Sequence, residues 1–396
     1  MALQERVTVG VAGAGAMGSG IAQVAAAAGN SVVIADAVPG AAAKAKGRVA
    51  KGIEGQVAKG KMSRADADAL LGRIDFRERP IGDDMSAFAE CGLVIEAIVE
   101  DLGAKKALFR QLEEVVDASC VLATNTSSLS VTSLGGERKN GGRFIGLHFF
   151  NPAQVMPLVE IIPWAGTAVD VKIGAQWLME SWGKTPVIAS DTPGFIVNRI
   201  ARPFYGEAIR IAEEGIADYA TIDRAVRDLG KFRMGPFELM DFIGNDVNFA
   251  VTKSVYEAMF HDPRYRPSLT QQRLVEAGFL GRKSGRGYYT YTDGVPGPVA
   301  NIDPVVGLLA FERILAMLIN EAVDAVPMRV ATPKDIDLAM TKGVNYPKGL
   351  LAWCDELGAE RVLGWMTHLQ AEYGEDRYRP SPLLRRMAAE SARFFA

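Results

Sequence analysis

His148 and Glu160 are the residues whose types and spacing most suggest chemistry. The chain holds only three histidines, and His148 lies in the apolar run IGLHFFNPAQVMPLVEII at residues 145–162. Glu160 interrupts the same run in LVEII. An unpaired buried carboxylate is costly, whereas a carboxylate beside an imidazole fixes the tautomer of the ring and stabilises its charged form. We therefore predict a proton-transfer pair; the alternative is a hydrogen-bonded core histidine and an edge-strand glutamate.

A glycine-rich turn near the start of the chain predicts dinucleotide binding. A β-rich run over residues 7–11 enters Gly13-Ala14-Gly15-Ala16-Met17-Gly18, followed by an Ala-rich helical stretch and a second strand that ends at Asp36. Gly13 permits the tight turn, Gly15 lets backbone approach a pyrophosphate, and Gly18 allows close helix–strand packing. The helix N-terminus then faces the phosphates. The carboxylate of Asp36 suits an adenosine ribose and repels a 2′-phosphate, so NAD is favoured over NADP.

Dinucleotide binding without a metal-ligand cluster indicates hydride transfer, which needs a group that moves the hydroxyl proton. His261 lies in the turn-like MFHDPRYRP, and His368 lies on a predicted helix in WMTHLQAEYG. Only His148 follows a predicted strand, and it precedes a turn at Asn151-Pro152. The sequence therefore favours His148 as the proton carrier.

Further α/β alternation predicts a Rossmann-type N-terminal domain. Helical spacing over residues 39–61 and 101–117 alternates with apolar runs at 92–98 and 121–128. Ligands of doubly wound sheets gather beyond the carboxyl ends of the strands. The candidate contacts that follow such strands are Glu100, Lys105, Asn125 and Ser127, although each of them taken singly is better explained as a solvated loop residue.

Composition limits the other classes of function. The 396 residues are 48% hydrophobic and 23% charged, with a net charge of −3, which gives no electrostatic case for nucleic acid or an anionic membrane. No apolar stretch reaches membrane-spanning length, and the first residues lack a signal peptide's apolar region. Three scattered cysteines (Cys91, Cys120, Cys354) indicate reduced, buried thiols. We expect a cytoplasmic protein without nucleic-acid binding, membrane insertion or a metal site.

Seven stretches resemble the L-3-hydroxyacyl-CoA dehydrogenase family of fatty-acid β-oxidation. They are VAGAGAMGSGIA, VIEAIVED, ATNTSSLSVTSL, GLHFFNPAQVMPLVEII, DTPGFIVNRI, MGPFELMDFIG and GRKSGRGYYTY, in the order of the family over residues 6–291. HFFNP and TPGFIVNR are far more specific than a glycine loop. The resemblance implies NAD as cofactor, an acyl-CoA substrate, and reversible oxidation of a (S)-3-hydroxyacyl-CoA to the 3-ketoacyl-CoA.

The resemblance also implies roles for individual residues. His148 would be the general base, Glu160 would orient it, and Ser127 and Asn198 would bond the substrate oxygen. Lys59 and Lys61 lie where the family meets the CoA phosphates, although a solvated helix end explains them equally. The family positions around NAD are matched by Asp36, Glu100, Lys105, Ser127, Asn151 and Lys283.

Helical patterns dominate beyond residue 190 and repeat. Residues 199–226 align with residues 313–340 at a shift of 114 (RIARPFYGEAIRIAEEGIADYATIDRAV and RILAMLINEAVDAVPMRVATPKDIDLAM). After this stretch, we predict a contraction of three residues that places GPFELMDF (235–242) over YPKGLLAW (346–353). The second copy has Glu312 opposite Asn198, so we interpret it as structural. We predict a Rossmann-type domain at 1–190, a first helical copy at 191–291, a linker at 292–304 and a degenerate copy at 305–396.

In the resembled family, single-copy members dimerise through this helical domain, and larger relatives carry two copies that pack together. We therefore expect that residues 300–396 take the place of a dimer partner. A monomer is then feasible, and a homodimer remains possible.

Three alternatives remain open from the sequence. The related β-hydroxyacid dehydrogenases share GxGxMG but use a catalytic lysine, for which we find no motif. A dehydrogenase of the same superfamily that oxidises a non-CoA hydroxy acid would keep His148 and Glu160 but would not be inhibited by CoA. A non-catalytic NAD-binding sensor would have no need for Ser127, His148, Glu160 and Asn198 together.

Overall fold

The computed structural model describes residue 3 and residues 6–78, 84–292, 297–301 and 303–395. The chain forms two compact units, residues 1–192 and residues 193–396. The predicted linker at 292–304 lies partly outside the described residues.

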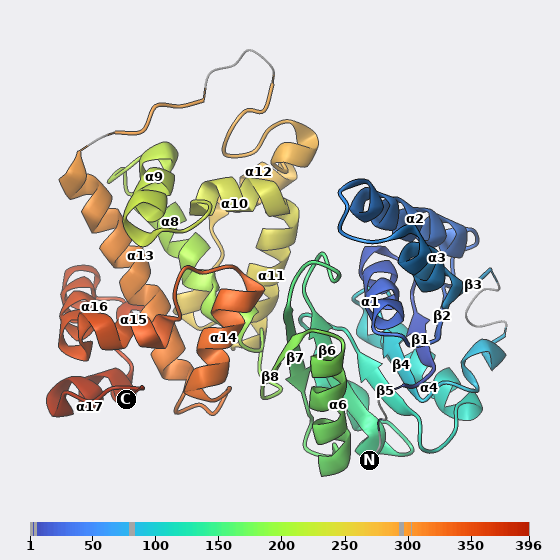
Figure 1. Ribbon diagram of the computed structural model, residues 1–396. Coiled ribbons are helices and arrows are strands. Elements are labelled where there is room, and N and C mark those ends of the chain that lie inside the picture. Colours follow the sequence, from blue (N-terminus) through green and yellow to red (C-terminus); the bar gives the residue numbers. More distant parts are fainter. Residues whose placement is uncertain (1–2, 4–5, 79–83, 293–296, 302, 396) are drawn as a thin grey trace. The chain divides into compact units, whose positions relative to one another are not determined.

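The first unit is a doubly wound α/β sheet, as predicted. Its strands lie in the order β3-β2-β1-β4-β5-β6-β7-β8 (Figure 1). Pairing is parallel from β3 to β6, antiparallel between β6 and β7, and parallel again between β7 and β8. The strands are β1 (Val9–Ala12), β2 (Val32–Ala35), β3 (Ile74–Arg77), β4 (Leu93–Glu96), β5 (Val121–Thr124), β6 (Phe144–Phe149), β7 (Leu158–Ile162) and β8 (Thr185–Ile188).

Helices cover both faces of this sheet, which explains why its central strands are continuous apolar runs. One face packs α1 (Ala16–Ala27), α2 (Ala41–Ala58), α3 (Arg64–Gly72) and α6 (Val169–Ser181) against alternate strand residues such as Val11 and Leu147. α4 (Leu102–Val115) and α5 (Val131–Gly135) contribute to the other face, where the rings of Phe109 and Phe144 meet edge-on at 4.8 Å. Because side chains alternate along a strand, His148 and Glu160 lie on this second face.

The second unit is mainly helical. Its first half holds α7 (Val197–Ile200), α8 (Arg202–Glu213), α9 (Tyr219–Gly230), α10 (Pro236–Ile243), α11 (Asn245–Ala258) and α12 (Leu269–Glu276). Its second half holds α13 (Pro304–Ala325), α14 (Pro333–Gly343), α15 (Leu350–Leu357), α16 (Ala359–Tyr373) and α17 (Pro382–Glu390).

The helical pattern that we predicted beyond residue 190 is interrupted at Ala201, between α7 and α8. Pro203 accounts for the break, because its ring lacks an N–H and clashes with the carbonyl four residues earlier. The second half has Met317 at the corresponding position, and α13 runs there without interruption.

The three-residue contraction that we predicted in the second half is wrong. Asp223 accepts hydrogen bonds from the backbone of Phe237 and Glu238, at 2.9 Å each. Asp337 accepts the same two bonds from Leu351 and Ala352, also at 2.9 Å. Each pair of equivalent residues is therefore shifted by 114, and the helix start at Gly235 corresponds to Gly349, not to the stretch that begins at residue 346.

Reciprocal buried ion pairs join the two halves of this unit. The guanidinium of Arg199 donates to Glu321 at 2.7 Å, and that of Arg313 donates to Glu207 at 2.6 Å. Adding 114 to Arg199 gives Arg313, and adding 114 to Glu207 gives Glu321, so the two pairs are equivalent with the halves exchanged. The contacts thus follow an approximate two-fold relation between the halves.

Candidate active site

His148 and Glu160 lie directly opposite each other on the antiparallel strands β6 and β7. The distance from Nδ1 of His148 to Oε2 of Glu160 is 2.6 Å, and the residues are 5% and 0% exposed. The imidazole ring lies against Phe150, with ring centres 4.5 Å apart. Because Glu160 engages Nδ1, it fixes the orientation of the imidazole ring.

The loop that carries Ser127 is organised around the carboxylate of Glu100. Oε1 of Glu100 accepts hydrogen bonds from the hydroxyl of Thr126 at 2.6 Å and from the backbone N–H groups of Ser127 and Ser128 at 2.9 and 3.1 Å. Burial opposes ionisation of Glu100, but the charge of Lys105 and these hydrogen bonds prevail and lower its pKa to about 2. Glu100 is therefore an anion that fixes the backbone of Ser127.

Lys105 is buried between two carboxylates. Its Nζ lies 2.7 Å from Glu96 and 2.9 Å from Glu100. Burial raises the pKa of Glu96, and Lys105 opposes this rise. Sequence reasoning assigned Lys105 to the surroundings of NAD; the structure places its ammonium where it supports Glu100.

Two further contacts complete the framework of the loop. Oδ1 of Asn125 accepts the backbone N–H of Phe149 at 2.8 Å, which ties the end of β5 to the strand of His148. Asp191 accepts the backbone N–H groups of Val131 and Thr132 at 3.1 and 2.7 Å, at the start of α5. Sequence reasoning missed Asp191, although an aspartate just before Thr-Pro-Gly was a usable signal.

The glycine loop fits the pyrophosphate of a dinucleotide. Gly13 has φ +115°, and a Cβ there would lie 2.4 Å from the carbonyl oxygen of Ala97. A Cβ on Gly18 would lie 1.9 Å from the oxygen of Gly13, whereas one on Gly15 would meet no atom within 4 Å. Gly15 precedes α1 without a side-chain cap, so the first backbone N–H groups of the helix are available to an anion.

Charged side chains hold this loop on two sides. Asp36 accepts the backbone N–H of Ala14 at 2.6 Å and that of Val38 at 2.9 Å. Arg48 of α2 donates to the carbonyl of Ala14 and, at 3.1 Å, to the hydroxyl of Ser19. Arg48 was not found from the sequence, because nothing in the Ala/Lys/Gly pattern of its helix distinguishes it.

The remaining predicted residues lie at the surface or in the second unit. Asn151 is exposed in the turn after β6, and Lys59 and Lys61 are exposed at the end of α2. Asn198 lies in α7, and Lys283 forms an ion pair with Asp246 at 2.5 Å; both belong to the second unit. The structure thus brings together His148 with Glu160, and Ser127 with Glu100.

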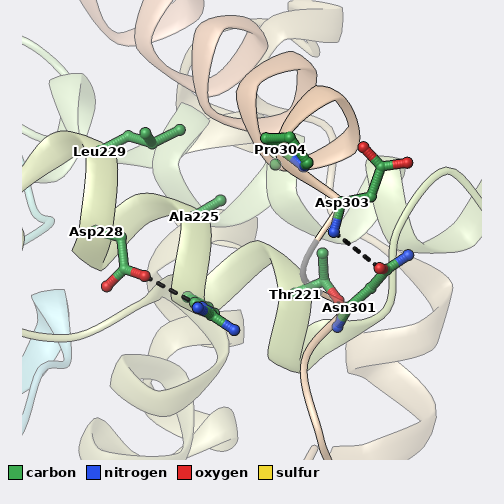
Figure 2. A pocket seen from close by; sticks show the side chains of 9 residues that line it. Thr221, Ala225, Asp228, Leu229, Asn301, Asp303 and Pro304 are labelled. Atoms are coloured by element: carbon green, nitrogen blue, oxygen red, sulfur yellow. Dashed lines mark hydrogen bonds and ion pairs between the residues drawn. The ribbon is translucent and has the colours of Figure 1, made fainter.

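A small cavity lies elsewhere in the second unit, between α9 and the start of α13 (Figure 2). Its volume is about 150 Å³. Its polar lining groups already have partners: Arg224 pairs with Asp228 at 3.1 Å, and Asn301 accepts the backbone N–H of Asp303 at 2.9 Å. Because these lining groups are held by partners within the unit, we assign the cavity no catalytic role.

Known families and structures match nearly the whole chain. Residues 8–192 match the 3-hydroxyacyl-CoA dehydrogenase NAD-binding domain, and residues 194–291 and 310–393 match the C-terminal domain of the same family. The 3-hydroxyadipyl-CoA dehydrogenase of Escherichia coli (strain K12) is 40% identical over 96% of this chain and 97% of that protein. The mitochondrial hydroxyacyl-coenzyme A dehydrogenase of Homo sapiens is 39% identical over 72% of this chain and 90% of its own length.

The crystal structure of 3-hydroxybutyryl-CoA dehydrogenase from Escherichia coli K12 has a TM-score of 0.90 at 39% identity and covers 98% of this chain and 99% of that one. No helix in the described part of the chain is long and apolar enough to cross a membrane. The chain belongs to the 3-hydroxyacyl-CoA dehydrogenase family, and it catalyses the NAD-dependent oxidation of 3-hydroxyacyl-CoA.

Proposed function

We propose that His148 is the general base that removes the 3-hydroxyl proton from a (S)-3-hydroxyacyl-CoA. The observation that carries this proposal is the buried 2.6 Å contact between His148 and Glu160 at the carboxyl end of β6. Bound NAD supplies the acceptor for the hydride that leaves C3. Nε2 of His148 takes the proton while Glu160 stabilises the imidazolium that forms. In the reverse direction the imidazolium returns the proton to the oxygen at C3.

Ser127 and Asn198 are the proposed ligands of the substrate oxygen. A hydroxyl and an amide each donate a hydrogen bond without gaining charge, which suits an oxygen that becomes more negative in the reduction direction. The bonds from the backbone of Ser127 and Ser128 to Glu100 support this role, because they fix the loop before substrate arrives.

The cofactor contacts are part of the same proposal. The backbone of residues 13–18 would hold the pyrophosphate, and Asp36 the adenosine ribose. Glu100, Lys105, Asn151 and Lys283 would lie around the remainder of NAD, with Lys105 acting through Glu100. Lys59 and Lys61 would meet the CoA phosphates; their exposure just after α2 is compatible with this role.

The test is the formation of NADH from NAD and 3-hydroxyacyl-CoA esters of several lengths, with wild type and His148→Gln side by side. We expect His148→Gln to lose at least about 10³-fold in kcat and to keep its affinity for NADH. Near-wild-type turnover by the variant would refute the assignment of His148.

We also propose that one chain is a complete functional unit without a partner. The buried pairs Arg199–Glu321 and Arg313–Glu207 support this, because the second helical half supplies to the first the contacts that a second subunit would otherwise supply. Sedimentation equilibrium should give the mass of one chain. An obligate dimer built through residues 195–290 would contradict the proposal.

A further inference from the structure

Arg202, the first residue of α8, is a buried cation that lacks an acidic partner. It is 6% exposed, and its Nε donates to the carbonyl of Asn198 at 2.8 Å. Its Nη1 donates to the hydroxyl of Thr252 at 3.0 Å and weakly to the carbonyl of Asn248 at 3.4 Å. Within the described residues, no carboxylate forms an ion pair with it and Nη2 makes no hydrogen bond. An uncompensated buried charge is costly, so an anion is expected to join it.

The other buried arginines of this unit show the contrast. Arg199, Arg264, Arg313 and Arg377 each lie within 3.3 Å of at least one carboxylate oxygen. Burial lowers the pKa of Arg202, whereas nearby carboxylates raise the pKa of Arg199 and Arg264 against the same effect of burial. The unit therefore neutralises its other buried guanidinium groups with carboxylates, whereas that of Arg202 lies over the ring of Tyr205, 5.0 Å from the ring centre, without a carboxylate partner among the described residues.

Two buried donors near Arg202 also lack acceptors. Nδ2 of Asn248 and Oη of Tyr346 make no hydrogen bond, and the residues are 2% and 5% exposed. Gln271 donates to Oδ1 of Asn248 at 3.1 Å, which leaves Nδ2 as the free end of that amide. Burial raises the pKa of Tyr346 well above its usual value, so the phenol keeps its proton and can donate. Arg202 and Tyr346 lie close enough to interact electrostatically.

The corresponding positions in the second helical half are apolar. A shift of 114 residues takes Arg202, Asn248 and Thr252 to Ala316, Val362 and Met366, all of them fully buried. The same shift relates Tyr346 to Phe232, and the two rings pack with centres 4.9 Å apart. The helical fold therefore packs at these places without polar groups, and the polar cluster in the first half is not a requirement of the fold.

The location of Arg202 indicates which anion it would receive. Nε of Arg202 lies 2.8 Å from the carbonyl oxygen of Asn198, so the guanidinium is next to the residue that is proposed to bind the oxygen at C3. In an adipyl chain the distal carboxyl carbon lies three bonds beyond C3, roughly 4 Å when extended. If Asn198 binds the oxygen at C3, a carboxylate at the far end of such a chain can reach the guanidinium.

We propose that Arg202, Asn248 and Tyr346 form a subsite for the distal carboxylate of a dicarboxylyl-CoA substrate. This inference rests on the proposed function, in which Asn198 binds the oxygen at C3. A carboxylate accepts from the guanidinium and from both unsatisfied donors, so one ligand group neutralises the cation and fills the empty hydrogen-bonding positions. An unbranched acyl chain that ends in a methyl group would leave all three unsatisfied. The second helical half would then supply one specificity residue, Tyr346, rather than serve only as support.

The experiment compares 3-hydroxyadipyl-CoA with 3-hydroxybutyryl-CoA as substrates of wild type, Arg202→Met and Tyr346→Phe. The readout is the ratio of kcat/KM for the adipyl ester to kcat/KM for the butyryl ester. We expect this ratio to exceed one in wild type, to fall about 100-fold in Arg202→Met, and to fall about 10-fold in Tyr346→Phe. Tyr265→Phe is the matched control, because Tyr265 is a buried phenol that already donates to Glu321 at 2.5 Å, and its ratio should not change.

The outcomes separate this inference from the proposed function. A wild type that oxidises neither ester would refute the proposed function. A wild type that oxidises both, with variants that lower both rates in parallel, would overturn the subsite and leave the proposed function standing. A preference of wild type for the butyryl ester would overturn it as well. If Arg202→Met fails to fold, Tyr346→Phe decides, because it removes one oxygen from a position whose counterpart is already phenylalanine.

Discussion

Replacing Glu160 by glutamine isolates the electrostatic part of the proposed mechanism. Glutamine keeps the size of the side chain and an oxygen that can accept from Nδ1 of His148, but it removes the negative charge. The two residues are almost fully buried and their contact is 2.6 Å long. With charge centres about 4 Å apart and an effective dielectric constant of about 20, the carboxylate stabilises an imidazolium by ~4 kcal/mol. That loss corresponds to roughly a 10³-fold decrease in the rate of oxidation.

The assay is the formation of NADH from 3-hydroxybutyryl-CoA and NAD at saturation, in the direction in which the imidazolium develops. We expect kcat of Glu160→Gln to fall by about three orders of magnitude, with an NADH dissociation constant within about twofold of wild type. Glu113→Gln is the control, since Glu113 has a 2% exposed side chain in the same unit and faces Arg138 and Arg143 instead of His148. It should lower stability and leave kcat within a few-fold of wild type.

Two results would refute this reasoning. If Glu160→Gln kept more than about a tenth of kcat, the charge of Glu160 would have no large part in the proton transfer. If Glu113→Gln lost as much activity as Glu160→Gln, the effect would come from damage to the unit and not from the loss of the partner of His148.

Three further changes test the glycine loop at residues 13–18, the carboxylate of Glu100 and the ion pair between the two helical halves. Gly18→Ala should weaken NADH binding at least tenfold and lower the melting temperature, because its Cβ would lie 1.9 Å from a backbone oxygen. The Cβ of Gly15→Ala meets no atom, so this variant should weaken NADH binding without changing the melting temperature of the cofactor-free protein. A wild-type NADH affinity in Gly15→Ala would contradict the phosphate-binding role of the loop. The pKa of Glu100 is about 2 in the folded protein and near 4.5 ordinarily, so the stability that ionised Glu100 gives to the fold is complete above pH 4.5 and is lost as pH falls toward 2. Urea titrations of the wild type should show a loss of ~1–2 kcal/mol of unfolding free energy, a value reduced by solvent screening because the side chain is 35% exposed. Glu100→Gln should lack this loss. Glu207→Gln should cost about 3–5 kcal/mol of unfolding free energy, because it removes the buried carboxylate that Arg313 and Arg377 share. Arg313 keeps Glu214 as a second partner, so a double-mutant cycle with Arg313→Met should recover part of this loss, whereas simple additivity would contradict a direct pair.

The sequence was sufficient for the parts of the structure that follow from local pattern. The glycine spacing and the apolar runs around it predict a parallel sheet with a dinucleotide loop, because period, turn chemistry and capping act over a few residues. The pairing of His148 and Glu160 was predictable for a similar reason: two polar residues in apolar strands, close in sequence, need each other. Both predictions depend on short-range information.

What the sequence could not reveal depends on contacts between distant residues. Nothing in the pattern of α2 marks Arg48 as a ligand of the glycine loop. Asp191 is recognisable before Thr-Pro-Gly, but its partners Val131 and Thr132 at the start of α5 are 60 and 59 residues away. The shift of 111 residues predicted for the end of the repeat is wrong because it rests on matching the proline of GPFELMDF to the proline of YPKGLLAW. The feature that the two halves share is instead an aspartate, Asp223 or Asp337, that accepts hydrogen bonds from backbone N–H groups 14 and 15 residues later, at the start of α10 or α15.

Duplication within one chain allows the two helical halves to diverge in a way that a symmetric pair of identical subunits cannot. In such a pair, a buried polar residue that serves one site appears in both copies, and its cost in stability is incurred twice. Here the first half buries Arg202 and Asn248, which we assign to the carboxylate subsite, while Ala316 and Val362 fill the equivalent places with apolar atoms. The hydroxyl of Tyr346 has no counterpart on Phe232. The second half thus keeps the reciprocal ion pairs that hold the unit together, and each half carries its polar groups at positions where the other half is apolar.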